Sequence, residues 1–350
     1  MLEAKNYKEE LSFGKGAFGN AFIFRDLKTG KRVAVKQIAF ADEQELENAQ
    51  KEVDIMKDLK SDFIVQCFGS YVKDHNFCIV MHYCEQGDLQ KFINKNIAKR
   101  EYISEEKFFD FAAQLACGLE YIRKKRILHR DLKPGNIFIS GRGRLKIGDF
   151  GISKKMDEEE YANTVVGTRI FLSPEMMKSW TYTEKVDMWA FGIILYYLAE
   201  NKYPFDCSNE ASIVLSIAEQ DPAPFKNLKN PVAQNLILKL LTKDPSQRWS
   251  TEDILNIPEI KQHVDNFNSS DFTYSLTMPF TLSSLLNTTG IVNRNRFAQT
   301  FPIQRENVDS NSISLIQEQG TSQLLSSLIS TAQNQTSPNF QQIQNDQLEQ

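Results

Sequence analysis

The stretch Leu128–Asn136, LHRDLKPGN, gathers chemically active side chains into one short segment. A histidine, an arginine, an aspartate, a lysine and an asparagine fall within eight residues. The segment is too polar for a buried strand and too short for a charged helix face, and its proline would break a helix. The pattern therefore predicts a loop, and a loop of this composition indicates a functional site.

The composition of the 350-residue chain is that of a globular protein, with 41% hydrophobic and 25% charged residues. The length fits one large domain or two ordinary ones. A formal net charge of −4 argues against a basic nucleic-acid binder. The five cysteines show no CxxC or zinc-ligand spacing, so we interpret them as free thiols in a reducing compartment.

Neither a signal sequence nor a membrane span is expected. The first ten residues, MLEAKNYKEE, are too charged for a secretory signal. The longest apolar run, 188–199, is shorter than the roughly 20 residues that a span requires, and we interpret it as a buried core helix. We therefore expect a soluble intracellular protein without a membrane contact. Its expected location is cytoplasmic, with cytoskeletal association or a nuclear location as alternatives.

The composition changes after about residue 265. From 266 to 350, polar uncharged residues dominate, and such a segment buries too little apolar surface to offset the entropy of ordering. We expect a mostly disordered, low-complexity tail. Within 321–330, TSQLLSSLIS, one helical face would carry Leu324, Leu325, Leu328 and Ile329. These are either a few leucines in a disordered tail or a short helix that docks on a partner.

The chain up to about residue 80 is predicted to be rich in strands, and the chain from Gly87 onward mainly helical. Alternating or short apolar runs predict the strands, and apolar residues three or four apart predict the helices. The expected strands include 32–38, 63–72 and 77–84, and the expected helices include 45–59 and 105–127. The sequence thus predicts an α+β fold, in which a small sheet with one main helix precedes a larger helical region.

Three glycines, Gly14, Gly16 and Gly19, form a GxGxxG pattern. A dinucleotide-binding loop with this spacing would open a helix and need an acidic residue about 20 positions later. Here a strand-like run follows, and the charged residue in the next strand is Lys36. Glycines let the backbone approach phosphates, for which Lys36 would supply a positive charge, although a solvated edge-strand lysine is the alternative. A lysine in a cleft needs a carboxylate to hold it. Position alone does not distinguish Glu52 from Glu45 or Glu47 on the following predicted helix, but Glu52 flanks an apolar position and can face inward.

The polar loop 128–136 is followed by the motif GDFG, whose aspartate is Asp149. Together they supply the side chains that phosphoryl transfer needs. Phosphoryl transfer needs a held triphosphate, Mg²⁺ to neutralise its charge, and an aligned hydroxyl. Asp131 can accept the hydroxyl proton, and Lys133 can lie against the transferring phosphate. Asn136 and Asp149 can ligate magnesium through oxygen. Arg130 can bind an anion, such as a phosphate on a nearby loop.

These motifs, in this order, resemble those of the eukaryotic protein kinases, and the resemblance covers about residues 7–263. The matching set is GxGxxG, VAVK, Glu52, HRDLKPGN, DFG, SPE at 173–175, VDMWAFG at 186–192 and Arg248. The resemblance implies a bilobal fold with ATP in the cleft, an N-lobe over about 7–80 and a C-lobe over about 85–263. It also implies an ion pair between Arg248 and Glu175.

The resemblance implies a set of residues that bind the nucleotide: Phe13, Gly14, Gly16, Gly19, Ala21, Lys36, Glu52, Met81, Tyr83, Cys84 and Phe138. Met81 would be the gatekeeper, His82, Tyr83 and Cys84 would form the hinge, and Phe138 would pack beneath adenine. The resemblance further implies an apolar spine between the lobes, formed by Met56, Cys67, His129 and Phe150.

Among the kinases, the chain resembles the serine/threonine class and in particular the NIMA-related family. Lys133 stands where tyrosine kinases usually carry arginine or alanine. YCEQGDL, NIF after HRDLKPG, KIGDFGISK, LSPE and Ala21 resemble the NIMA-related pattern. His82 and Arg169 depart from the pattern, at a usually acidic hinge position and at a usual proline.

The implied function is ATP-dependent transfer of the γ-phosphoryl group to a serine or threonine of a protein substrate. A non-catalytic pseudokinase scaffold is the alternative, but such proteins usually lack one of Lys36, Asp131 and Asp149, and all three are present. A lipid or small-molecule kinase is a second alternative. The segment 149–175, with its Gly167–Thr168 motif, resembles protein-substrate enzymes instead.

Two expectations concern the regulation of this segment. Thr164 aligns with the family's usual phosphorylation site, so its phosphate would pair with Arg130 and order the loop. The alternative is that Thr164 is an unmodified loop residue. Thr168 would form a hydrogen bond near Asp131 without needing a phosphate.

Two residues imply a substrate preference. Ile152, the β-branched residue after DFG, is expected to leave room for the threonine methyl group, so threonine is expected to be preferred over serine. Gly135 stands where a carboxylate usually meets an arginine three residues before the acceptor, so an apolar residue is expected there. Asp88 could supply one carboxylate, which weakens the second expectation.

Overall fold

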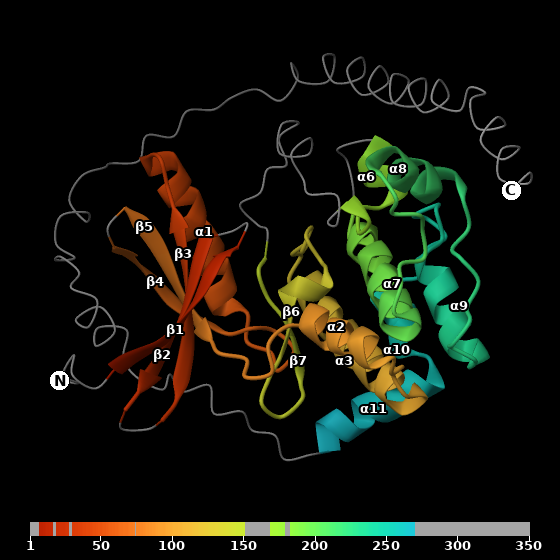
Figure 1. Ribbon diagram of the computed structural model, residues 1–350, viewed down its shortest axis with the longest axis horizontal. Helices are drawn as coiled ribbons and strands as arrows, with labels where there is room; N and C mark the ends of the chain where they lie inside the picture. The colour runs from red at the N-terminus through yellow and green to blue at the C-terminus, as the bar shows by residue number, and fades with distance from the viewer. Residues whose placement is uncertain are drawn as a thin grey trace, which may run out of the picture.

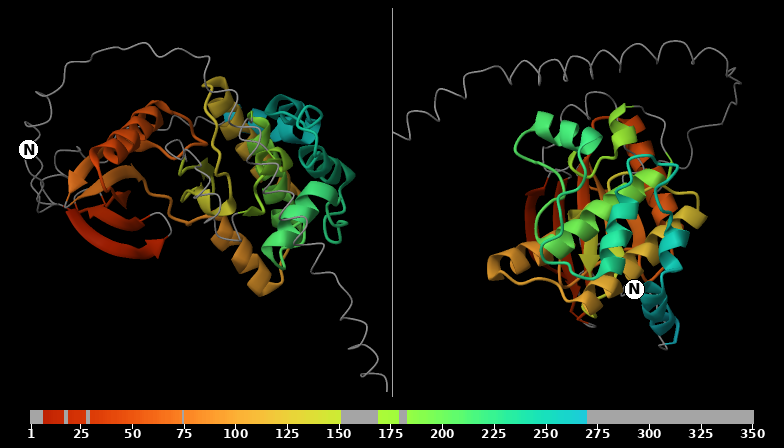
Figure 2. Two further views of the ribbon diagram at one scale, coloured as in Figure 1. Left: turned by 90° about the horizontal axis from the view of Figure 1, so that it is seen from above. Right: turned by 90° about the vertical axis from the view of Figure 1, so that its right-hand side faces the viewer.

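The computed structural model describes residues 7–16, 19–27, 30–73, 75–150, 169–178 and 183–269. Within these ranges the chain forms a β-rich N-lobe and a helical C-lobe, with two short strands between them (Figure 1 and Figure 2). This arrangement confirms the expected α+β bilobal fold. The expectations about Ile152, Thr164, Thr168 and the segment 321–330 lie outside the described residues.

The N-lobe sheet is antiparallel, with the strand order β1-β2-β3-β5-β4. Its strands are β1 (Tyr7–Gly16), β2 (Gly19–Asp26), β3 (Arg32–Ala39), β4 (Cys67–Lys73) and β5 (Asn76–His82). Val33 and Val35, at alternate positions of β3, are fully buried and pack with Val80 of β5. Alternating β-branched residues of this kind form the buried face of a sheet.

The strand expected at 63–72 begins only at Cys67. The preceding residues 63–66 belong to a loop that crosses to the other lobe, where the Val65 N–H donates to the Ile147 carbonyl at 2.8 Å. A short apolar run does not by itself distinguish a strand from a buried loop.

Helix α1 (Glu43–Asp58) packs on the sheet, close to the expected range 45–59 (Figure 1). Asp42 caps its N-terminus by accepting a hydrogen bond from the Glu45 N–H, 2.8 Å away. Val53 and Met56 turn into the core, and Glu52 is buried beside them.

The C-lobe consists of helices around one long buried helix. Its helices are α2 (Leu89–Lys99), α3 (Glu105–Lys124), α6 (Pro174–Lys178), α7 (Lys185–Glu200), α8 (Glu210–Glu219), α9 (Pro231–Leu240), α10 (Thr251–Leu255) and α11 (Pro258–Ser269). All α7 residues from Val186 to Glu200 are buried, which confirms the core helix predicted at 188–199. Among the described residues, none of the helices has the length and apolarity to cross a bilayer.

A small hairpin of β6 (Ile137–Ile139) and β7 (Leu145–Ile147) lies between the lobes (Figure 1). It follows a single 3₁₀ turn at Pro134–Asn136. The LHRDLKPGN segment is therefore a loop, as predicted, and β7 leads directly into Asp149.

The predicted boundary between domain and tail, at 263–266, falls within helix α11. Helix α11 continues to Ser269, and its Phe267 ring packs on Phe63, with the ring centroids 5.6 Å apart. The Phe267 ring holds this last turn against the folded domain. The residue composition around Phe267 is polar and does not reveal this single contact.

Candidate active site

A cavity of about 500 Å³ lies between the two lobes, a volume that fits a small-molecule site. Of the predicted site residues, its walls include Ala21, Lys36, Glu52, Met81, Tyr83, Cys84, Phe138 and Asp149. Ala34 and Val65 also line it and were not predicted. Ala34 precedes Lys36 by two positions and so lies on the same face of β3, which is a signal that the sequence contained.

The predicted glycine motif falls at the end of β1 and the start of β2. Phe13, Gly14 and Gly16 lie in β1, and Gly19 and Ala21 lie in β2. Gly16 pairs with Gly19 across the hairpin. Ala21 in turn pairs with Lys36, so the glycine hairpin is a direct neighbour of the strand that carries the lysine.

Lys36 forms an ion pair with Asp149 in the cavity. Glu52, the carboxylate expected to hold Lys36, is buried and lines the same cavity. Burial alone would raise the pKa of Asp149, but the charge of Lys36 and its hydrogen bond outweigh that effect and lower the pKa below its ordinary value. Asp149 is therefore held as a carboxylate.

Asp131 lies at the centre of a hydrogen-bonded cluster in the polar loop. Lys133 Nζ donates to both carboxylate oxygens of Asp131, at 3.0 and 2.9 Å. Asn136 Nδ2 donates to the Asp131 carbonyl at 2.8 Å and to Asp131 Oδ2 at 3.0 Å. The Gly148 N–H donates to the Asn136 carbonyl at 2.9 Å, which places the loop beside the GDFG segment.

Asp187, at the start of α7, holds the backbone of this loop. Its carboxylate accepts the N–H of His129 at 2.8 Å and the N–H of Arg130 at 3.0 Å. This role of Asp187 was not predicted from the sequence. The signal was an acidic residue inside the otherwise apolar run VDMWAFG, because a buried carboxylate needs hydrogen-bond donors.

The predicted spine is assembled, since Met56, Cys67, His129 and Phe150 are all buried. The rings of His129 and Phe150 lie 5.0 Å apart, and Phe150 shares a core cluster with Met56 and Cys67. His129 Nε2 lies 3.0 Å from the Gly148 carbonyl.

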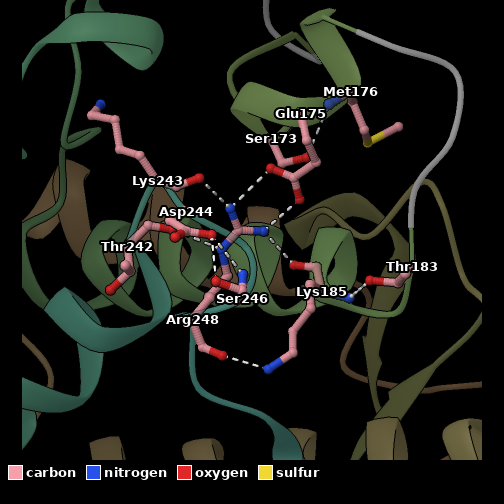
Figure 3. Close-up of polar contacts among 10 residues, drawn as sticks. All are labelled: Ser173, Glu175, Met176, Thr183, Lys185, Thr242, Lys243, Asp244, Ser246 and Arg248. Carbon is pink, nitrogen blue, oxygen red and sulfur yellow. Dashed lines mark hydrogen bonds and ion pairs between the residues drawn. The ribbon is translucent and has the colours of Figure 1, made fainter.

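The predicted pair of Arg248 and Glu175 is confirmed (Figure 3). Arg248 Nη1 and Nη2 donate to the two Glu175 oxygens at 2.6 and 2.9 Å, in a bidentate geometry. The guanidinium also donates to the Thr242, Lys185 and Lys243 carbonyls. Arg248 therefore ties α6 to the start of α7 and to the loop after α9 (Figure 3).

Arg169, which occupies the place of the expected proline, is buried and forms an ion pair with Glu210 at the start of α8. A buried guanidinium without a carboxylate would be strongly destabilising. Glu210 therefore explains how an arginine is accommodated at this position.

The comparisons with known proteins agree with this geometry. The family described as "Protein kinase domain" matches residues 7–260. The chain belongs to the protein kinase family.

Similar kinases include several of the Nek group, in agreement with the resemblance to the NIMA-related family. The chain is 35% identical to human serine/threonine-protein kinase Nek5, over 73% of this chain and 36% of that protein. It is 34% identical to serine/threonine-protein kinase nekl-2 of Caenorhabditis elegans, over 74% of this chain and 75% of that protein. It is 35% identical to human Nek11, over 76% of this chain but only 42% of that kinase. The chain thus spans less than half the length of Nek5 and Nek11.

Proposed function

We propose that the chain is an ATP-dependent serine/threonine protein kinase, which transfers the γ-phosphoryl group of ATP to a hydroxyl of a protein substrate. The observation that carries this proposal is the cluster of Asp131, Lys133 and Asn136 beside a cavity that contains Lys36 and Asp149. The pseudokinase alternative gains no support from this site, since each of these side chains is present.

The roles of the side chains follow from their charges. Asp131 accepts the proton of the substrate hydroxyl as its oxygen forms a bond to the γ-phosphorus. The bond from that phosphorus to the β-phosphate bridging oxygen breaks, and ADP leaves. Lys133, which contacts Asp131, stabilises the negative charge of the transferring group, and Lys36 binds the phosphates that remain on ADP.

The residues also fit Mg²⁺. Because Asn136 Nδ2 donates to Asp131, the side-chain oxygen Oδ1 of Asn136 is the atom that can bind a cation. Asp149 supplies a carboxylate, and Mg²⁺ typically uses one or two such protein ligands together with substrate phosphates. When bound, Mg²⁺ would neutralise the charge on the phosphate oxygens.

Transfer assays with different acceptor classes test the proposal. The full chain is incubated with γ-labelled ATP and a mixture of generic protein substrates, then with phosphoinositide vesicles and with free amino acids. We expect label on protein serine and threonine. Label on lipid or small molecules only would overturn the assignment to protein substrates, and no label on any acceptor would favour the pseudokinase.

We further propose that threonine is preferred over serine and that an apolar residue is preferred three positions upstream. The first preference rests on Ile152 after DFG. The second preference rests on Gly135, which supplies no carboxylate at the place where an upstream arginine would meet one. Asp88 is already engaged, since its carboxylate caps α2 through the Lys91 N–H at 2.8 Å and pairs with Lys91 Nζ at 3.0 Å.

A peptide array on the full chain tests both preferences. Threonine acceptors with Leu, Phe or Met three residues upstream should be phosphorylated fastest. Serine preference, or a preference for arginine upstream, would show that Ile152 and Gly135 do not set the choice.

We also propose that phosphorylation of Thr164 activates the enzyme by pairing with Arg130, which lies beside Asp131 on the loop. Mass spectrometry of active enzyme should find phosphate on Thr164. Full activity of enzyme that carries no phosphate there would contradict this proposal.

A further inference from the structure

Helix α11 ends in contact with two segments that lie far apart in the sequence. The Phe267 ring centroid lies 5.6 Å from that of Phe63, in the loop between α1 and β4. The guanidinium carbon of Arg144, just before β7, lies 4.3 Å from the Phe267 ring centroid. Figure 1 shows the turn between β6 and β7 reaching toward α11 at the base of the C-lobe.

Both segments support β7, which leads into the site. The Ile147 N–H donates to the Phe63 carbonyl at 2.8 Å, and the Val65 N–H donates to the Ile147 carbonyl at 2.8 Å. Val65 lines the nucleotide cavity, and Ile147 is two residues before Asp149. Phe267 therefore contacts Phe63, and Phe63 in turn is bonded to Ile147. Ile147 is bonded to Val65 of the cavity wall and lies just before the GDFG segment.

The packing around these residues leaves little space for a shift to be absorbed. A methyl group on Gly118 would lie 2.8 Å from Ile147 and 3.2 Å from Phe63. A methyl group on Gly148 would lie 2.7 Å from Val65. In a close-packed region a displaced side chain moves its neighbours rather than filling a void.

We propose that Phe267 is a positioning residue for nucleotide binding. By holding Phe63, it fixes Val65 and the segment from Ile147 to Asp149 in the geometry that the cavity requires. This inference rests on the proposed function, because it acts through the role of Asp149. It assigns to the last turn of α11 a part in the active site, although the surrounding composition resembles that of the tail.

Other contacts limit the size of the effect. The Lys60 N–H donates to Tyr121 Oη at 2.8 Å, and Lys146 Nζ donates to the Asp62 carbonyl at 2.7 Å, so α3 and β7 also hold this loop. The aromatic pair and the cation over its ring each contribute modestly, so removal of the Phe267 ring should weaken ATP binding about three- to tenfold.

The test compares three variants of the full chain. Phe267→Ala removes the ring, Phe267→Tyr keeps it, and Leu255→Ala removes another half-buried apolar side chain of the C-lobe, on α10. The readouts are the KM for ATP, the KM for a peptide substrate, ATP binding by calorimetry, and hydrogen exchange of the Val65 and Ile147 amides. Exchange in α7 serves as the internal reference.

We expect Phe267→Ala to raise the KM and Kd for ATP and to speed exchange at Val65 and Ile147, with the KM for peptide and the exchange in α7 unchanged. Phe267→Tyr should behave like the wild type, and Leu255→Ala should change none of these values. Wild-type ATP affinity and exchange in folded Phe267→Ala would overturn the proposal, as would equal effects of Leu255→Ala.

Two further outcomes are covered by the same experiment. If Phe267→Ala does not fold, Arg144→Ala removes the cation over the ring and should change ATP affinity and exchange in the same direction by a smaller amount. No change in this variant would overturn the proposal. If the wild type transfers no phosphate, the proposed function fails, while ATP calorimetry and hydrogen exchange still decide whether Phe267 positions the cavity.

Discussion

Arg130 and Asp149 adopt left-handed backbone conformations, with φ angles of 64° and 56°. This conformation costs a residue with a side chain about 1–2 kcal/mol. At Arg130 the cost is offset by Asp187, which accepts the N–H groups of His129 and Arg130. Strained residues of this kind concentrate at functional sites, and here they flank Asp131 and the nucleotide cavity.

The residues with a direct chemical task could be predicted, because phosphate binding and proton transfer require particular side chains in a fixed order. Some of the residues that hold them could not, although Glu52 and the pair of Arg248 and Glu175 were predicted. Asp187 is separated from Arg130 by 57 positions, and Glu210 is separated from Arg169 by 41. Neither pairing has a local sequence signature, since only the folded chain brings the partners together.

Replacement of Lys36 tests the phosphate-binding role. Lys36→Met should lower kcat about 10²–10³-fold, because one positioned cation is lost while most of the aliphatic chain is kept. Steady-state kinetics and circular dichroism should show lost turnover in a folded protein. Lys8→Met, at an exposed lysine of the same sheet, is the control and should keep full activity. Activity of Lys36→Met within threefold of the wild type would rule out the role.

At the level of elements, Arg248 connects α6, α7 and the loop that follows α9 through its hydrogen bonds. Arg248→Met would leave the Glu175 carboxylate without its bidentate partner, which typically costs about 3–5 kcal/mol. Urea denaturation should show this loss in the free energy of unfolding. Arg142→Met, at an exposed arginine, should change it by less than about 0.5 kcal/mol. Equal stability of the two variants would show that the pair of Arg248 and Glu175 does not stabilise the fold.

Glu120 joins α3 to α10 through a hydrogen bond from Thr251 Oγ1 at 2.5 Å. The hydrogen bond from Arg123 is the main reason that the pKa of Glu120 is lowered to about 2. Because the folded pKa lies below the unfolded value of about 4.3, the stabilisation is complete above that value and is lost as the pH falls toward 2.

The stability difference between wild type and Glu120→Gln should therefore shrink as the pH is lowered from 6 to 3. Denaturant titrations at several pH values measure it, with Glu219→Gln on the exposed face of α8 as the control. A difference that stays constant over this range would show that Glu120 is not held as a low-pKa carboxylate.

Elements with a strong hydrophobic pattern were predicted well. Segments whose conformation depends on one tertiary contact were not. The burial of α7 on all sides follows from its continuous apolar run. The loop at 63–66 and the last turn of α11 differ, because Val65 bonds to β7 and Phe267 packs on Phe63. Both contacts cross between segments that the sequence keeps far apart.

On the scale of the whole molecule, both lobes contribute to one site. The N-lobe provides Lys36 and Glu52, the C-lobe provides Asp131 and Asn136, and Asp149 forms an ion pair across to Lys36. The order of the motifs predicted this arrangement, because each motif belongs to one lobe. The expectations about Thr164, Thr168 and Ile152 come from the sequence alone. These three residues lie outside the described residues, so the expectations stay predictions.

The most direct test of the central claim is the Asp131→Asn variant of the full chain. The amide keeps the size of the side chain and one of its two acceptor oxygens, but it does not accept the substrate proton. ATP binding, measured by calorimetry, should stay within about threefold of the wild type, while phosphate transfer to protein should fall by at least about 10²-fold. Asp54→Asn, at an exposed aspartate on α1, should match the wild type in both. Transfer by Asp131→Asn at the wild-type rate would contradict the assignment of Asp131 as the base of a protein kinase.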